Sequence, residues 1–464
     1  MVYVLSKKLC NCKLLTILLK KIKQDLSHFS LENITLAAQI SQLQRPLALI
    51  CVAILLTKTG ISTYEIGVFE MMLFVSTTVN MLGMGTLVAS LMPVFGSASE
   101  AEKKGNIQLV YALILCFNIL VVSSLYVFQP SSIFVITGQY ELPFFSLLCL
   151  YILFHFPAGM LDVVLILYKE SKLLFLLSFC NFVAMIGAVI VSLMVNKGIE
   201  GILYGWIFYA ILKNIYLLYF FYKKRIFERV FGNLTLSRNY LLFVFPLLIY
   251  SVIGGIATNT DSWIINWFTN GDKSIFGIYR YGAREVPFIN AFCIGLSNVM
   301  VLQVSTNFHE GVAELKQKST ALMHKIFSIA LVLILLSPLL YPIAFSKAFL
   351  PSAEIFNIYI LLTISRLIFP QTVLYALKDS RAILIIGIID LVINIIMSLI
   401  LVQYMGIKGV AWGTVIAYTL EKVMIAFYLR YKYNISIKTY CRLDYFLYYS
   451  VLLCAFYMLG FFLH

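Results

Sequence analysis

Apolar stretches long enough to cross a lipid bilayer follow one another along almost the whole chain. A helix needs roughly 20 mainly apolar residues to span about 30 Å of hydrocarbon. The predicted spans are 33–57, 64–95, 107–128, 142–168, 173–195, 200–222, 240–267, 275–303, 326–346, 354–377, 382–403, 409–429 and 445–463. Because 61% of the residues are hydrophobic and only 12% are charged, the sequence predicts an all-α integral membrane protein.

Basic residues lie mostly on one side of these spans. With a cytoplasmic N-terminus, 24 of the 35 lysines and arginines fall in inward segments, five in outward loops and six inside spans. Loops rich in lysine and arginine stay in the cytoplasm during insertion. The bias therefore predicts the topology, and it explains the net charge of +14 without a nucleic-acid partner.

Sequence motifs recur about 209 residues apart. The matching segments are 66–69 with 276–279, 165–172 (LILYKESK) with 374–381 (LYALKDSR), and 198–205 (GIEGILYG) with 406–413 (GIKGVAWG). Six spans separate equivalent points, an even number, so both halves cross the membrane in the same orientation. We therefore expect a 12-helix core of two parallel six-helix bundles, an N-lobe and a C-lobe, around a central cavity, with an extra C-terminal span.

The expected segments follow from this repeat. They are a basic cytoplasmic segment at 1–29, the N-terminal bundle at 30–222, a cytoplasmic linker at 223–239, the C-terminal bundle at 240–430, and a basic loop with a thirteenth span at 431–464. No loop exceeds about 22 residues, which leaves no room for a soluble catalytic or nucleotide-binding domain. We expect a transporter rather than an enzyme, without cofactor or metal.

Ionisable side chains inside spans are costly, so each one is a candidate for function. Arg45 lies halfway along the first span with Gln42 near it on the same helical face, and Arg366 is similarly deep in the tenth. Arg280 and Arg284 share one face of the eighth span, where like charges repel unless an anion lies between them. We expect these five side chains to line a cavity for an anion, and a phosphate or diphosphate suits the planar fork of arginine.

Acidic side chains in the spans are candidates for ion coupling. The three candidates are Asp261, Asp390 and Glu70. A structural salt bridge or snorkelling toward a membrane surface stays an open alternative for the groups near span ends, namely Glu70, Asp162, Asp261 and Arg280. For Lys213, which the repeat aligns with Glu421 and Lys422, we favour a structural pair.

The passage TDSWIINWFTNGDKSIFGIYRYGAR at 260–284, with the twelve-span core and the glycine-rich entries to spans six and twelve, carries a resemblance. Over about 30–430 the chain resembles the polysaccharide-transporter branch of the multidrug/oligosaccharidyl-lipid/polysaccharide (MOP) exporter superfamily. The resemblance implies a flippase of the bacterial inner membrane. Such a flippase carries undecaprenyl-diphosphate-linked oligosaccharide units of O-antigen, the lipopolysaccharide glycan, or of capsule to the outer leaflet by alternating access.

The same resemblance implies site residues and partners. In flippases of this superfamily, arginines of the first and eighth helices line a cationic cavity, and Arg45, Arg280 and Arg284 occupy matching places. The implied partners are the lipid-linked oligosaccharide diphosphate, membrane lipids and the polysaccharide polymerase machinery.

Two other functions remain as alternatives. The first is a multidrug antiporter of the same superfamily. Drug exporters of the superfamily typically use an acidic residue within the first helix for cation coupling. The first span here has no acid beyond Glu32 at its edge, which counts against this function. A membrane glycan polymerase or ligase generally carries a large outward loop with catalytic side chains. The longest outward loop expected here, 129–141, holds no basic residue, which counts against the enzyme.

Overall fold

The computed structural model describes residues 34–81, 84–95, 99–228, 234–284 and 287–462, and these ranges contain helices and turns but no strand. Eleven helical stretches within them are long and apolar enough to cross a membrane. The last of these, Leu443–Gly460, coincides with the predicted thirteenth span. The prediction of an all-α, multi-pass membrane protein is confirmed, whereas the predicted segment 1–29 lies outside the described residues.

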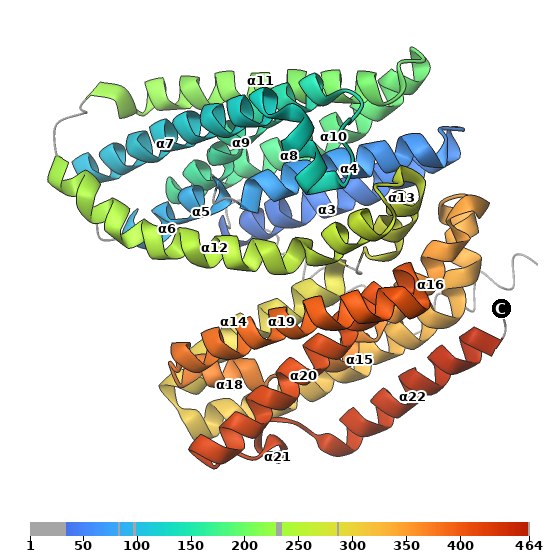
Figure 1. Ribbon diagram of the computed structural model, residues 1–464. Helices are drawn as coiled ribbons and strands as arrows, with labels where there is room; N and C mark the ends of the chain where they lie inside the picture. The colour runs from blue at the N-terminus through green and yellow to red at the C-terminus, as the bar shows by residue number, and fades with distance from the viewer. Residues whose placement is uncertain (1–33, 82–83, 96–98, 229–233, 285–286, 463–464) are drawn as a thin grey trace, which may run out of the picture.

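The first half of the chain forms one group of helices (Figure 1). They are α3 (Ile34–Lys58), α4 (Thr63–Met81), α5 (Met84–Ala89), α6 (Leu91–Phe95), α7 (Glu100–Val127), α8 (Gln129–Thr137), α9 (Phe145–Leu167), α10 (Ser171–Met194), α11 (Gly198–Lys223) and the 3-10 turn η1 (Ile226–Glu228). Helix α3 packs on α10, and α9 packs on both α7 and α11.

Two features of this half differ from the predicted spans. The stretch 64–95 is three helices, α4 to α6, rather than one. The predicted outward loop 129–141 contains helix α8, which has a proline in its first turn and ends at Gly138 in the left-handed conformation. A proline in the first turn and a left-handed glycine after the last turn are common helix-end signals that a hydropathy pattern does not register.

The second half forms the remaining helices. They are α12 (Leu234–Phe268), α13 (Lys273–Gly282), α14 (Pro287–Thr306), α15 (Phe308–Ala344), η2 (Lys347–Phe349), α16 (Leu350–Ile360), α17 (Leu362–Arg366), α18 (Pro370–Ala376), α19 (Ser380–Met405), α20 (Ile407–Tyr433), α21 (Ile437–Tyr440) and α22 (Leu443–Phe462). Figure 1 shows α14 to α22 as a second group, while α12 and α13 run along the first. Helix α12 contacts α4, α5, α7 and α8 as well as α19 and α20.

Predicted spans of this half also need correction. Helix α15 begins at Phe308, well before the expected start at 326, and its added turns carry polar pairs such as Lys318 with Glu314 at 2.6 Å. The tenth span is interrupted between α17 and α18, where Pro370 has no amide hydrogen to continue a helix. Polar helix ends and broken helices both escape a search for continuous apolar runs.

The two halves meet through glycines at equivalent positions of the repeat. Gly67 on α4 and Gly277 on α13 are 210 residues apart, the offset of their matching motifs. A Cβ atom on Gly277 would lie 3.1 Å from the Cα of Gly67, and one on Gly67 would overlap the carbonyl group of Lys273. Only glycine permits this close approach of α4 to α13.

The repeat also appears at the matching Lys-acid-Ser segments 165–172 and 374–381. Lys224 donates a hydrogen bond to Glu170 at 2.8 Å, and Lys432 donates one to Asp379 at 2.7 Å. Tyr428 and Tyr433 also donate to Asp379, each at 2.8 Å, so this carboxylate has three side-chain donors. These hydrogen bonds, from Lys432 first, hold the pKa of Asp379 well below its usual range.

We expect Gly67→Ala to lower the thermal unfolding midpoint of the purified protein in detergent. The added methyl group must push α13 away from α4, and overpacking of this kind costs about 1–3 kcal/mol. Gly187→Ala is the matched control, because nothing lies within 4 Å of a Cβ at that position on α10. Equal midpoints for the two variants would contradict the close contact.

We expect Asp379→Asn to destabilise the protein at pH 7 more than Glu170→Gln, its counterpart in the first half. A depressed carboxyl pKa contributes stability above the unfolded value of about 3.9 and loses it as the pH falls through the folded value, so neutral pH is the condition for the comparison. Glu170 has a single lysine partner at a half-exposed position, where a pair contributes little. Unfolding midpoints that rank the other way would refute the three-donor account.

Candidate functional site

The eighth span is interrupted at Arg284. Helix α13 ends at Gly282 and α14 begins at Pro287, and residues 285–286 between them lie outside the described residues. Beyond the end of α13, Arg284 donates from Nη1 to the carbonyl oxygen of Leu49 on α3 at 3.1 Å. Leu49 follows Arg45 by four residues, about 6 Å along the helix and on the same face. The break thus brings Arg284 within one helical turn of Arg45.

Glu70 joins the two arginines of the eighth span. Its side chain is fully buried on α4 and accepts a hydrogen bond from Nη2 of Arg284. Nε of Arg280 lies 3.5 Å from the other carboxylate oxygen, near enough for an ion pair but long for a hydrogen bond. Arg280 also reaches Ser262 on α12 at 3.5 Å. We call Glu70, Arg280 and Arg284 the Glu70 cluster.

The Glu70 cluster follows directly from the glycine contact. Glu70 comes three residues after Gly67, and Arg280 comes three residues after Gly277, so the two charges are equivalent positions of the repeat. The close approach of α4 and α13 brings these equivalent positions together, with an acid on one helix and a base on the other. The scaffold is therefore symmetric here, while its charges are not.

The cluster carries more positive than negative charge. Two guanidinium groups share one carboxylate, and their side chains remain 29% and 21% exposed although Glu70 is not exposed at all. Among the described residues, Arg45 forms no ion pair with a carboxylate and lies close enough to Tyr151 and His155 on α9 to act on both electrostatically. Gln42 is exposed on α3 nearby. The partly exposed guanidinium surface is available to an anion.

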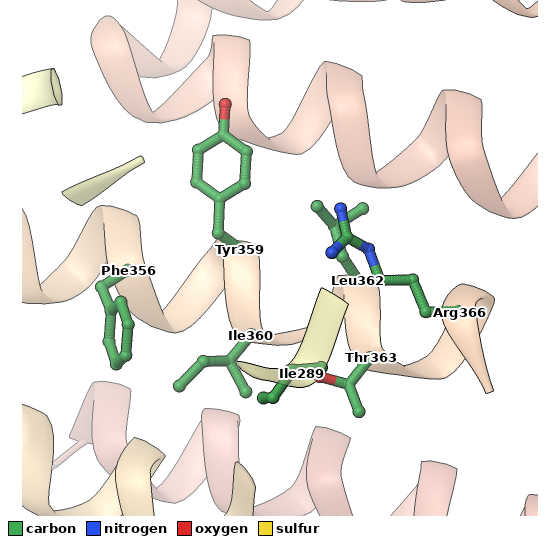
Figure 2. Close-up of a pocket in the computed structure, with 7 residues that line it drawn as sticks. All are labelled: Ile289, Phe356, Tyr359, Ile360, Leu362, Thr363 and Arg366. Atoms are coloured by element: carbon green, nitrogen blue, oxygen red, sulfur yellow. The ribbon is translucent and has the colours of Figure 1, made fainter. Parts of the chain in front are cut away.

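Arg366 lies apart from this cluster, at the end of α17. It lines a small cavity of about 20 Å³ in which residues of α14 and α16 also take part, room for about one water molecule. Figure 2 shows its guanidinium beside Leu362, and the ring of Tyr359 on α16 points in the same direction. The break in the tenth span thus leaves a charged side chain at an interrupted helix, as the break in the eighth span does at Arg284.

Asp261 on α12 is held by hydroxyl groups from other helices. Its Oδ2 accepts hydrogen bonds from Tyr359 at 2.6 Å and Thr414 at 2.7 Å, with Tyr279 at 3.4 Å. Asn394 in turn donates to Thr414 at 3.3 Å. Because Tyr359 also lines the cavity of Arg366, Asp261 connects that cavity to the helix that meets Arg280 through Ser262.

Lys213 and Lys422, the two lysines that the sequence placed inside spans, each have a partner within their own half. Lys213 donates to Asp162 at 2.8 Å, between α11 and α9. Lys422 donates to Glu421 at 2.5 Å and to Gln371 at 2.9 Å, between α20 and α18. Both lysines thus form structural contacts, which is the interpretation that the sequence favoured.

The sequence missed the hydroxyl and amide partners of this network. Tyr359 and Thr414 lie 98 and 153 residues from Asp261. Such side chains are common in spans and carry no charge, so neither hydropathy nor the cost of burying a charge distinguishes them. Only the folded positions of α12, α16 and α20 bring them together.

Comparisons with known proteins give the fold. No protein-family model matches the sequence, and no curated protein sequence matches it. The solved structure of the lipid II flippase MurJ, in an inward closed conformation, is similar with a TM-score of 0.68 and 19% identity over 91% of each chain. An inward-facing multidrug resistance transporter of the MATE family is similar with a TM-score of 0.61 and 13% identity, covering 91% of this chain and 99% of that one.

A MATE transporter from Vibrio cholerae gives a TM-score of 0.55 with 14% identity, covering 88% of this chain and 97% of that one. At such low identities the similarity concerns the fold alone. The predicted fold class is confirmed: the chain has the all-helical fold shared by MOP-superfamily flippases and multidrug transporters.

Proposed function

We propose that this protein is a flippase that moves undecaprenyl-diphosphate-linked oligosaccharide units of O-antigen or capsule from the inner to the outer leaflet of the bacterial inner membrane. The observation that carries the proposal is the excess of positive charge where α3, α4 and α13 meet. Arg280 and Arg284 share the single carboxylate of Glu70, and Arg45 lies one turn from the contact of Arg284 on α3. An anionic cargo suits this charge, whereas a cationic drug does not.

The physical need for a protein comes from the cargo. An oligosaccharide loses several kcal/mol for each uncompensated polar group in hydrocarbon, so a polar path between the halves removes most of the barrier. The membrane potential favours export, since an anion leaving a negative interior gains about 2.3 kcal/mol per charge per 100 mV. A diphosphate gains roughly twice that amount.

The Glu70 cluster suggests how binding leads to movement. A diphosphate offers the arginines more charge and more oxygens than the carboxylate of Glu70 does, in the bidentate geometry that guanidinium groups prefer. When the diphosphate takes Arg280 and Arg284, the ion pairs that connect α13 to α4 weaken. In our proposal this exchange releases the halves to rock around the bound diphosphate, which is alternating access.

Ion coupling is a second part of the proposal. Asp261 combines a carboxylate with the hydroxyl oxygens of Tyr359 and Thr414, the hard ligands that small cations take. Asp390 on α19 is another candidate, whereas Glu70 is engaged by both arginines. A cation at Asp261 would act close to the junction, because the adjacent Ser262 contacts Arg280.

We expect Arg45→Ala, Arg284→Ala and Arg366→Ala to reduce glycan export in cells that carry no other copy of the gene. Losing a hydrogen bond to a charged group costs about 1.5–3 kcal/mol, or roughly a 10- to 150-fold loss of affinity. Surface polysaccharide is measured by labelling intact cells at equal levels of membrane-inserted protein. Lys408→Ala is the control, because this basic residue is 42% exposed and pairs with Glu354 away from the cluster.

Two outcomes would refute the proposal. Full export by all three arginine variants would show that these residues do not hold the cargo. Cells that lack the protein, keep their surface polysaccharide and become sensitive to cationic drugs would identify a multidrug antiporter instead.

A further inference from the structure

We propose that Gln371, Asp390, Glu421 and Lys422 form a binding site for one monovalent cation, a proton or an alkali ion, inside the second bundle. These residues come from α18, α19 and α20, and we call them the Lys422 site. The inference concerns this chain whatever its cargo. Only the use of the cation to drive transport rests on the function proposed above.

Lys422 is the centre of the site. Its Nζ donates to Glu421 at 2.5 Å and to Gln371 at 2.9 Å, and the side chains of Lys422 and Glu421 are 13% and 11% exposed. Asp390 on α19 and Lys422 on α20 each lie 16 residues from Gly406, where the chain turns between these two packed helices. The charged groups that act on Asp390 are Glu421 and Lys422.

Asp390 has an oxygen without a donor. Its Oδ1 is buried and accepts no hydrogen bond from any described residue. Besides α18 and α20, α19 packs against α12, whose carboxylate Asp261 is already engaged by Tyr359 and Thr414. The site therefore has two carboxylates and one ammonium group, a net negative charge at membrane depth. Buried charges persist only when they are paired, so the site requires one more positive charge.

The first bundle contains the same arrangement without this excess. Asp162 aligns with Gln371 at an offset of 209, and Lys213 falls opposite Glu421 and Lys422 at offsets of 208 and 209. Asp162 and Lys213 form a single pair at 2.8 Å. The residue aligned with Asp390 is Asn181, which is uncharged. In the second half, Gln371 takes the place of the acid Asp162, and two other acids, Asp390 and Glu421, are present. The requirement for a cation is therefore specific to the second half.

The position of Gln371 gives the cation a mechanical effect. Gln371 follows Pro370, the first residue of α18, so Lys422 holds α18 to α20 directly after the break that follows Arg366. With a cation bound, Asp390 is neutralised and Lys422 stays with Glu421 and Gln371. Without it, Asp390 competes for Lys422, and the hold on α18 weakens.

The test uses the purified full-length protein in detergent and needs no transport assay. Its thermal unfolding midpoint is measured from about pH 5 to pH 8 in choline chloride, above the range where a free aspartate ionises, and again at fixed pH with increasing Na⁺. A proton site predicts that the midpoint falls by about 2 °C or more as the pH rises, because the folded state then loses a bound proton. An alkali-ion site predicts that the midpoint rises with Na⁺.

Asp390→Asn, which mimics the neutralised site, should remove either dependence and resemble the loaded wild type. Asp162→Asn, its matched control in the first half, should keep the dependence of the wild type. Glu421→Gln provides a second variant if Asp390→Asn does not fold. A wild-type midpoint that responds to neither cation, or an Asp390→Asn protein that keeps the full response, would overturn the site. Because the readout is stability, the test of the cation site can fail while the proposed glycan export holds, and the reverse.

Discussion

A buried carboxylate shared by two guanidinium groups is the interaction on which the arrangement of the halves depends. Glu70 has no exposed surface, so its charge needs a partner in this conformation, and its partners Arg280 and Arg284 come from the other half of the repeat. The pairing exists because glycines at equivalent positions let α4 and α13 touch. The same contact leaves the arginines in excess, so one local geometry joins the halves and attracts an anion.

The sequence predicts most of the fold because membrane insertion imposes strong and local rules. Apolar length, the bias of basic residues and a repeated Lys-acid-Ser turn lead to the spans and their parallel repeat, and the turn acids Glu170 and Asp379 contact equivalent lysines. The breaks at Arg284 and after Arg366 are harder to predict from the sequence, since each span remains apolar on both sides of its break. The partners of Asp261 cannot be predicted from the sequence, because uncharged hydroxyl groups that are distant along the chain give no signal in a sequence pattern.

Polar contacts connect the parts that the proposed mechanism uses. From the Glu70 cluster, Arg280 reaches Ser262, whose neighbour Asp261 binds Tyr359, which lines the cavity of Arg366. Lys422 then holds the helix that follows the Arg366 break. Cargo binding at one end and cation binding at the other would act on the same interrupted helices. The first half, with its single Lys213–Asp162 pair, provides the balanced counterpart.

The central claim is that the Glu70 cluster recognises a diphosphate through positive charge that Glu70 does not neutralise. Native mass spectrometry of the purified protein with equal amounts of a polyprenyl diphosphate and the matching uncharged polyprenol measures this directly. Our account predicts that the wild type retains the diphosphate lipid in preference to the alcohol, and that Arg284→Ala loses the preference. Equal retention of the two lipids by the wild type would contradict it.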